Sequence, residues 1–237
     1  MNAMRRLIET SVYVAVALLM VAAWLIEPYA VVSGSMHPTL LGPHREFDCA
    51  KCGRRTVVPA DEPPIADRRL RCIYCATAGP FEDALGVVPG DALLVDRTVF
   101  ARRSPLRWEV IAFRLPGEAA KIAVKRVAGL PGETVSVRGG RLFIDDVPAV
   151  DGPPGLDYSL PRGHHDPAQW RLGSDEYFVV GDNPTVSDDS RTWSAGPAVA
   201  AQLIVGKPFI VHVPRRMIDV AGRRFHVPDF AAIRYIR

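Results

Sequence analysis

The chain has 237 residues, of which 48% are hydrophobic and 23% are charged, a composition typical of a folded protein with a sizeable core. Its 29 basic and 26 acidic residues leave a formal charge of only +3, which argues against nucleic acid as a main partner. The 19 glycines and 21 prolines are enough to separate many short strands, so we predict a mainly β fold.

The first informative segment is an uncharged apolar run over residues 11–26, which follows two arginines. The run is slightly shorter than the about 20 residues that cross a bilayer core, but its neighbours extend it, and we expect a transmembrane anchor over residues 10–28. The positive-inside rule then places residues 1–9 in the cytoplasm and the rest of the chain outside. The alternative is a cleavable signal peptide with Ala30 as the cleavage site. That cleavage would leave Ser35 almost at a new N-terminus, which favours the permanent anchor.

Directly after this run, residues 33–40 read Ser-Gly-Ser-Met-His-Pro-Thr-Leu, and we interpret Ser35 as a nucleophile. A serine hydroxyl is weakly nucleophilic at neutral pH, so it needs a base and donors for the developing oxyanion. Lys125 is a candidate base because it lies in an apolar run, where burial would lower its pKa. The alternative is that Lys125 points outward from its strand and is solvated, with Arg126 facing the opposite side.

The segment 42–86 differs in composition and contains all four cysteines of the chain. They form two Cys-x-x-Cys pairs separated by nineteen residues, which is the spacing of a zinc ribbon. We expect a zinc-ribbon-like insert whose structural zinc ion is bound by Cys49, Cys52, Cys72 and Cys75, since a four-thiolate site is closed. Two disulfides are an alternative, and so is a redox pair, although the βαβ context of a redox pair is missing. Because it follows Leu41, the insert is expected near the serine, as a lid, a membrane rest or a docking surface.

From residue 87 onward, short apolar runs alternate with turn signals, as in antiparallel strands. The expected strands are residues 108–113, 122–127 and 203–212, and residues 176–183 are expected to be a strand that runs into a turn. Residues 134–144 are an expected hairpin with Gly139 and Gly140 at its turn. Residues 187–191, Ser-Asp-Asp-Ser-Arg, either brace a site by hydrogen bonds or form an ordinary polar turn. Residues 214–237 are a basic tail that either lies against anionic lipid or is solvated.

Three motifs follow one another behind the apolar run. They are the serine motif, Lys-Arg-x-x-Gly-Leu-Pro-Gly at residues 125–132, and Gly-Asp-Asn at 181–183 followed by Ser-x-Asp-Ser-Arg at 187–191. In this order they closely resemble type I signal peptidase, and the resemblance covers the anchor, the serine motif and residues 87–208. It implies a β-rich peptidase domain made of residues 29–41 and 87–213, and it does not explain the segment 42–86.

The resemblance implies that Ser35 is the nucleophile and Lys125 the general base of a serine endopeptidase, with no cofactor for catalysis. Other implied roles are the oxyanion donor Ser33, the lysine-orienting Ser187, the bracing residues Asp182, Asp189, Arg191 and Arg126, and the pocket residues Tyr29, Val31, Met36 and Val124. The implied reaction removes signal peptides from exported preproteins after an Ala-x-Ala-like site at the inner membrane. Implied partners are these signal peptides, the lipid bilayer and the secretion machinery.

Two stretches depart from the family pattern. Residues 184–186 are Pro-Thr-Val where the family usually has Arg-Asp-Asn, and residues 107–109 are Arg-Trp-Glu where it usually has Arg-Gly-Asp. The alternative function is a catalytically silent membrane scaffold whose zinc ribbon binds a partner, but the intact Ser35 and Lys125 argue against it. A self-cleaving repressor of the same chemistry would need a DNA-binding domain, for which we find no room before Ser35.

Overall fold

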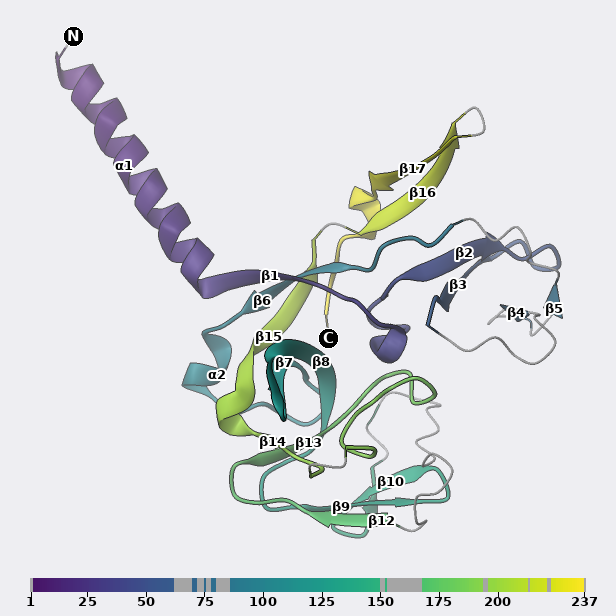
Figure 1. Ribbon diagram of the computed structural model, residues 1–237. Coiled ribbons are helices and arrows are strands. Elements are labelled where there is room, and N and C mark those ends of the chain that lie inside the picture. The colour runs from purple at the N-terminus through teal and green to yellow at the C-terminus, as the bar shows by residue number, and fades with distance from the viewer. Residues whose placement is uncertain are drawn as a thin grey trace.

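The computed structural model describes residues 2–61, 70–71, 75, 78–79, 86–149, 152, 168–193, 196–212, 214–220 and 223–236 (Figure 1). Within these ranges strands greatly outnumber helices, as the composition predicted. The body is an antiparallel sheet in the order β1-β6-β15-β7-β8-β13-β14, with β18 paired to β15. These strands are β1 (Ile26–Ala30), β6 (Ala92–Asp96), β7 (Val110–Leu115), β8 (Glu118–Gly129), β13 (Glu176–Val180), β14 (Val199–Ala200), β15 (Ile204–Val211) and β18 (Arg234–Tyr235).

The central strands of this sheet are covered on both faces. The first four residues of β7 and the last four of β13 are all buried, where a half-exposed strand would alternate. The strand expected over residues 108–113 begins at Val110, because Trp108 has a φ of 66°, in the left-handed region that interrupts an extended chain. Two short helices, α2 (Val99–Arg102) and η2 (Ala201–Leu203), join strands of this sheet.

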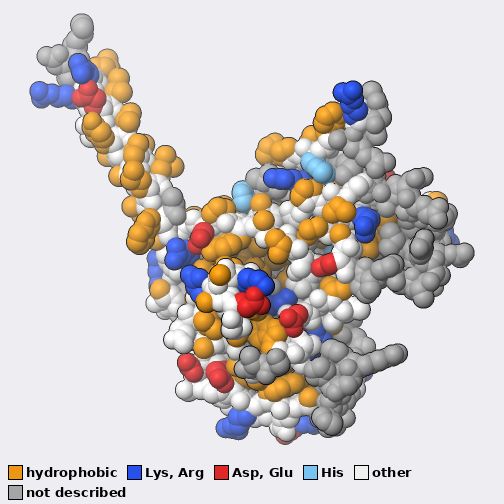
Figure 2. Space-filling model, in the orientation of Figure 1, with side chains coloured by type: hydrophobic (Ala, Val, Ile, Leu, Met, Phe, Trp, Pro, Cys, Tyr) orange, Lys and Arg blue, Asp and Glu red, His pale blue; other side chains and the backbone are white. Residues whose placement is uncertain are grey.

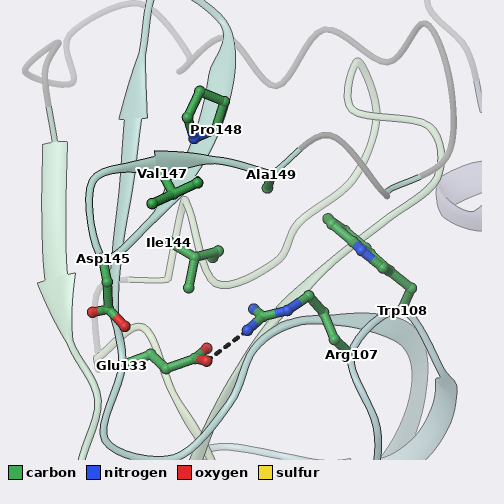
Figure 3. Close-up of a pocket in the computed structure, with 8 residues that line it drawn as sticks. All are labelled: Arg107, Trp108, Glu133, Ile144, Asp145, Val147, Pro148 and Ala149. Carbon is green, nitrogen blue, oxygen red and sulfur yellow. Dashed lines mark hydrogen bonds and ion pairs between the residues drawn. The ribbon is translucent and has the colours of Figure 1, made fainter.

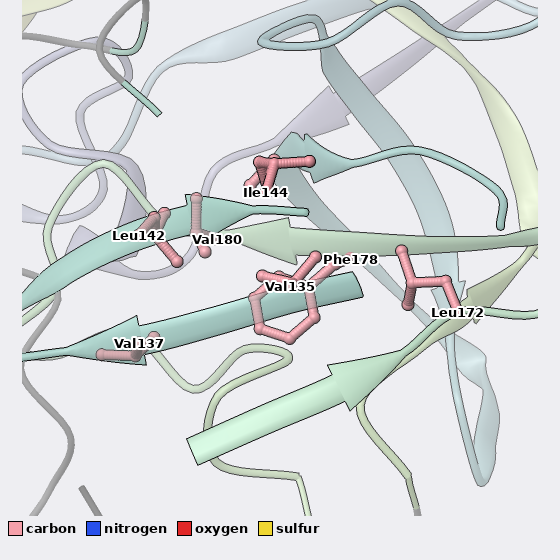
Figure 4. Packing of buried hydrophobic residues seen from close by; sticks show 8 residues of the cluster. Val135, Val137, Leu142, Ile144, Leu172, Phe178 and Val180 are labelled. Carbon is pink, nitrogen blue, oxygen red and sulfur yellow. The ribbon is translucent and has the colours of Figure 1, made fainter. Parts of the chain in front are cut away.

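A second sheet has the order β11-β10-β9-β12, with β9 (Thr134–Arg138), β10 (Arg141–Ile144), β11 (Val147–Pro148) and β12 (Ala168–Arg171). The predicted hairpin is confirmed: β9 and β10 pair around Gly139 and Gly140, whose φ angles are 54° and 75°, as a two-residue turn of this kind requires. The second sheet packs on β13 of the main sheet through an apolar cluster (Figure 4). The cluster includes Val135, Val137, Leu142, Leu172, Phe178 and Val180.

Helix α1 (Asn2–Leu25) projects away from the body (Figure 1). It begins earlier than the anchor predicted over residues 10–28 and ends sooner, because the chain from Ile26 onward pairs with β6 as strand β1. In the described part of the chain we find no helix that is long and apolar enough to cross a membrane. The predicted transmembrane helix is therefore not confirmed.

The insert contains the hairpin of β2 (His44–Asp48) and β3 (Arg55–Pro59), and the short pair of β4 (Leu70–Arg71) and β5 (Ala78–Gly79). At the hairpin's base, His44 and Val88 exchange two backbone hydrogen bonds of 3.0 and 2.7 Å, which tie the insert to the body just before β6. The segment predicted as a basic tail contains the hairpin of β16 (Arg215–Val220) and β17 (Arg223–Pro228), the short helix η3 (Phe230–Ala232), and β18, which adds to the main sheet.

Candidate active site

The serine motif folds as a short helical turn, η1 (Gly34–Met36), anchored by its apolar members. The side chains of Met36 and Leu40 are almost fully buried and pack in a core cluster with residues of the main sheet. A hydrogen bond from the Leu40 N–H to the Met36 carbonyl, 2.9 Å long, closes the segment. Ser35 directly precedes the buried Met36 in this turn, and only 7% of its surface is exposed.

The two hydroxyls of the motif lie side by side. Ser33 precedes the turn in an extended conformation, and its Oγ is 3.1 Å from the Ser35 Oγ. This distance permits a hydrogen bond, so a group bound at the Ser35 hydroxyl also lies within reach of the Ser33 hydroxyl.

The segment after β13 holds the turn from a second side. The Asn183 N–H donates to the Ser35 carbonyl at 2.9 Å. A Cβ placed on Gly181 would lie 2.2 Å from the Ser187 Oγ and 2.5 Å from the Ser35 carbonyl oxygen, which leaves room only for glycine. Two motifs about 150 residues apart in sequence therefore meet in space, with the Ser187 hydroxyl close to the serine turn.

Lys125 lies on β8 opposite Ile111 of β7, and only 5% of it is exposed, which rules out the solvated alternative. Burial lowers the pKa of Lys125 to about 8, although the nearby carboxylates of Asp189, Asp188 and Asp182 favour its charged form. With this pKa about a tenth of the amine is neutral at pH 7, which makes it usable as a base.

Asp189 is the centre of a buried hydrogen-bond network. It accepts hydrogen bonds from the Ser187 hydroxyl at 2.6 Å and from the Gly181 N–H at 2.9 Å, and it forms an ion pair with Arg191 through the Arg191 Nε at 2.8 Å. Residues 187–191 thus form hydrogen bonds among themselves and with Gly181, while their role in supporting a site stays a prediction.

A second buried ion pair joins Arg126 to Asp182. The Arg126 Nε and Nη2 donate to the two carboxylate oxygens at 2.8 and 2.6 Å, and the hydroxyl of Thr39 in the serine motif donates to the same carboxylate at 2.5 Å. Bidentate pairing fixes both partners in orientation as well as in distance. The chain neighbour of Lys125 is thereby connected to the segment that carries Ser35.

A third group of contacts holds the end of the serine motif and involves Asp91 and Arg234, which the sequence did not reveal. The Asp91 carboxylate accepts hydrogen bonds from the Leu41 N–H at 2.8 Å and from Arg234 at 2.6 Å, and Arg234 also donates to the Thr39 carbonyl at 3.2 Å. Asp91 follows a Pro-Gly turn and is indistinguishable in sequence from a turn residue, while Arg234 lies in the segment predicted as a tail.

Three of the four predicted pocket residues come together. Val31 and Val124 pack against the core cluster that contains Met36, whereas Tyr29 lies on β1 and is not part of this cluster. A separate pocket of about 340 Å³ lies beside the second sheet (Figure 3). It is bordered by Trp108 and by the Arg107–Glu133 ion pair of 2.5 Å, and it contains none of the predicted site residues.

Three of the four cysteines lie in the described residues and form a cluster. The sulfur atoms of Cys49, Cys52 and Cys75 all lie within 4.8 Å of one another, and those of Cys49 and Cys75 are 3.6 Å apart. Sulfurs in a tetrahedral site with 2.3 Å zinc–sulfur bonds are about 3.8 Å apart, so the arrangement fits the ion. Cys72, the fourth predicted ligand, lies outside the described residues.

Residues 85–213, more than half of the chain, match the family described as signal peptidase, peptidase S26. The chain belongs to this family. The matched range contains Lys125, Asp182 and Asp189 and begins after the serine motif and most of the insert.

Individual relatives carry the same family name. A signal peptidase I of Leptolyngbya laminosa is 34% identical over 147 residues, which cover 56% of this chain and 64% of the relative. A signal peptidase I of Pseudomonas fluorescens is 26% identical over 253 aligned positions, which cover 92% of this chain and 74% of the relative. A solved signal peptidase I from Enterococcus faecalis V583 is 28% identical, with 44% of this chain and 95% of that chain covered and a TM-score of 0.34. The chain thus spans less than two thirds of the Leptolyngbya laminosa relative's length.

Proposed function

We propose that the protein is a membrane-held serine endopeptidase that removes N-terminal signal peptides from exported preproteins after an Ala-x-Ala-like site. Membership of the S26 family supports the reaction class. The observation that carries the proposal for this chain is the burial of Lys125, which lowers its pKa to about 8 beside the network that braces the serine turn. Burying a lysine costs stability, so a buried lysine with a lowered pKa is a candidate functional group whose neutral amine is used.

In the proposed mechanism the neutral amine of Lys125 takes the proton of Ser35 as its Oγ attacks the scissile carbonyl. The same proton then passes to the leaving amine, and a water molecule repeats the cycle on the acyl-enzyme. The Ser33 hydroxyl and the Ser35 N–H stabilise the oxyanion. Ser187 orients the amine: its own proton is donated to Asp189, so its oxygen is left to accept a hydrogen bond from Lys125.

The substrate preference is proposed from the apolar, uncharged surroundings of Val31, Met36 and Val124. Such a pocket suits a methyl side chain and rejects a larger one by overpacking. We expect a preprotein with Ala at positions −1 and −3 to be cleaved, and its variant with Phe at −1 to be cleaved at least about 100-fold more slowly.

Peptide mapping of the products measures this preference, with Phe at position −2 as the matched control because that side chain would not enter the small pockets. Cleavage of the −1 Phe and −2 Phe substrates at equal rates would contradict the proposed specificity, and no cleavage of the Ala-x-Ala preprotein would contradict the proposed function.

Membrane attachment is proposed from the surface of α1. Its apolar side chains, Leu18, Leu19 and Trp24 among them, are exposed, and Trp24 is 82% exposed. Figure 2 shows hydrophobic side chains along the projecting helix. We expect the full chain to stay with membranes after alkaline carbonate washing and a variant without residues 2–25 to be released. Release of both forms would refute attachment through α1.

The insert is proposed to hold one structural zinc ion on Cys49, Cys52, Cys72 and Cys75. The ion would join the two Cys-x-x-Cys pairs into one closed module and would supply no catalytic chemistry. The mutual distances of the three described sulfurs support this proposal.

A further inference from the structure

The cysteine-rich insert contacts the serine turn directly. The Gly34 N–H, between the two serines of the motif, donates a hydrogen bond of 2.8 Å to the Asp61 Oδ2. Asp61 comes two residues after Pro59, the last residue of β3 in the insert. A carboxylate from outside the peptidase domain therefore binds the backbone of the segment that carries the proposed nucleophile.

The two segments are also packed closely. A Cβ placed on Gly34 would lie only 2.5 Å from the Cβ of Pro59 and 2.6 Å from the Asp61 Oδ1. The proline ring cannot move aside as a flexible side chain would, so position 34 accepts only glycine while the insert lies here. The insert thus covers one side of the serine turn.

The part of the insert that carries Asp61 is fixed to the body. The Ala60 N–H donates to the Pro43 carbonyl at 2.8 Å, and the hairpin base is held by the paired hydrogen bonds between His44 and Val88. Asp61 therefore approaches Gly34 from a supported backbone, as a positioning group requires.

The hydrogen bond acts on the peptide unit between Ser33 and Gly34. Holding that peptide restricts rotation about the bond between the Ser33 Cα and its carbonyl carbon, and this rotation helps to set where the Ser33 side chain lies. The Ser33 Oγ is 3.1 Å from the Ser35 Oγ. From the other side, the Asn183 N–H holds the Ser35 carbonyl at 2.9 Å. The turn is thus held between the bracing network of the peptidase domain and the insert.

We propose that Asp61 is a positioning residue for the nucleophile, and that the insert serves the active site by fixing the Ser33–Gly34 peptide through this carboxylate. The catalytic consequence rests on the proposed peptidase function, whereas the contact and its effect on the turn do not. Small displacements of reacting groups have large effects on rate, so losing this support should slow catalysis without weakening substrate binding.

The kinetic test compares Asp61→Ala, Asp61→Asn and Asp48→Ala in the full-length protein with an Ala-x-Ala preprotein. We expect Asp61→Ala to lower kcat about tenfold with KM within about twofold of wild type, and Asp61→Asn, whose amide oxygen still accepts, to keep kcat within about threefold. Asp48 lies on the same hairpin and pairs with Arg55, away from the serine turn, so Asp48→Ala is the matched control and should retain wild-type kcat. Equal losses in Asp61→Ala and Asp48→Ala, or wild-type kcat in Asp61→Ala, would overturn the proposal.

Hydrogen exchange of the Gly34 amide gives a readout that needs no cleavage. Asp61→Ala should speed its exchange at least about tenfold relative to wild type and to Asp48→Ala, because the amide loses its acceptor. If wild type proves inactive on preproteins, the proposed function fails while this measurement still tests the contact. Unchanged exchange in Asp61→Ala would refute the positioning role, whatever the activity.

Discussion

Replacing Ser35 by alanine or Lys125 by methionine is expected to lower kcat for preprotein cleavage by about 10⁴-fold or more, since each change removes one member of a pair that acts as a unit. Methionine fills nearly the volume of the buried lysine stem, so Lys125→Met removes the amine with little loss of packing. Ser33→Ala should have a smaller effect, a fall in kcat of about 10²–10³-fold, because it removes one oxyanion donor and leaves the dyad.

The pH dependence identifies the base. Burial lowers the pKa of Lys125 to about 8, and the amine works only when neutral. We therefore expect kcat/KM to rise about tenfold per pH unit below pH 8 and to level off above it. A lysine with an ordinary pKa of about 10.4 would instead keep kcat/KM rising through pH 9.

The matched control for Lys125→Met is Lys121→Met. Lys121 is on the same strand, β8, but its side chain is 67% exposed and pairs with Glu118. The Lys121→Met variant should keep the activity and the pH profile of wild type. Substantial cleavage by Lys125→Met, or a wild-type profile that is flat between pH 6 and 9, would refute the role of Lys125 as base.

Local sequence patterns predict those elements whose conformation depends on neighbouring residues alone. The Gly139-Gly140 hairpin needed only a turn with positive φ between two apolar runs, and the structure has it. The sequence left the orientation of Lys125 open, because an apolar run does not show which face of its strand a lysine side chain takes. The structure buries it on β8, which lies between β7 and β13.

Pairings between distant segments could not be predicted in this way. Asp91 and Arg234 are 143 residues apart and meet only because β18 adds to the main sheet beside β15. Periodicity says nothing about which strand an isolated short strand will join, so the sequence predicts residues 214–237 only as a basic tail. The contact of Asp61 with Gly34 was missed for the same reason, although the sequence did place the insert near the serine.

Purified protein is expected to contain about one zinc ion per chain and four thiols that react only after chelation. The sulfurs of Cys49 and Cys75, 3.6 Å apart, are well beyond the about 2 Å of a disulfide bond and close to their spacing around zinc. Elemental analysis measures the zinc content per chain, and thiol titration with and without a chelator measures the number of reactive thiols. Cys49→Ser should lose the metal, whereas Lys51→Ala, an exposed change in the same turn, should keep it. Absence of metal together with two intact disulfides would refute the zinc site.

The metal cluster and Asp61 are at opposite ends of the β2–β3 hairpin, whose five-residue strands span about 17 Å. Binding energy at a structural zinc site is folding energy, so removing the ion should loosen the hairpin from its cysteine turn toward its base. We expect chelation to make the 42–86 segment sensitive to protease and to speed exchange of the Gly34 amide, less than Asp61→Ala does. If chelation opens the segment but leaves Gly34 exchange unchanged, the base of the hairpin is held by its bonds to Val88 and Pro43 alone, and the metal does not influence the serine turn.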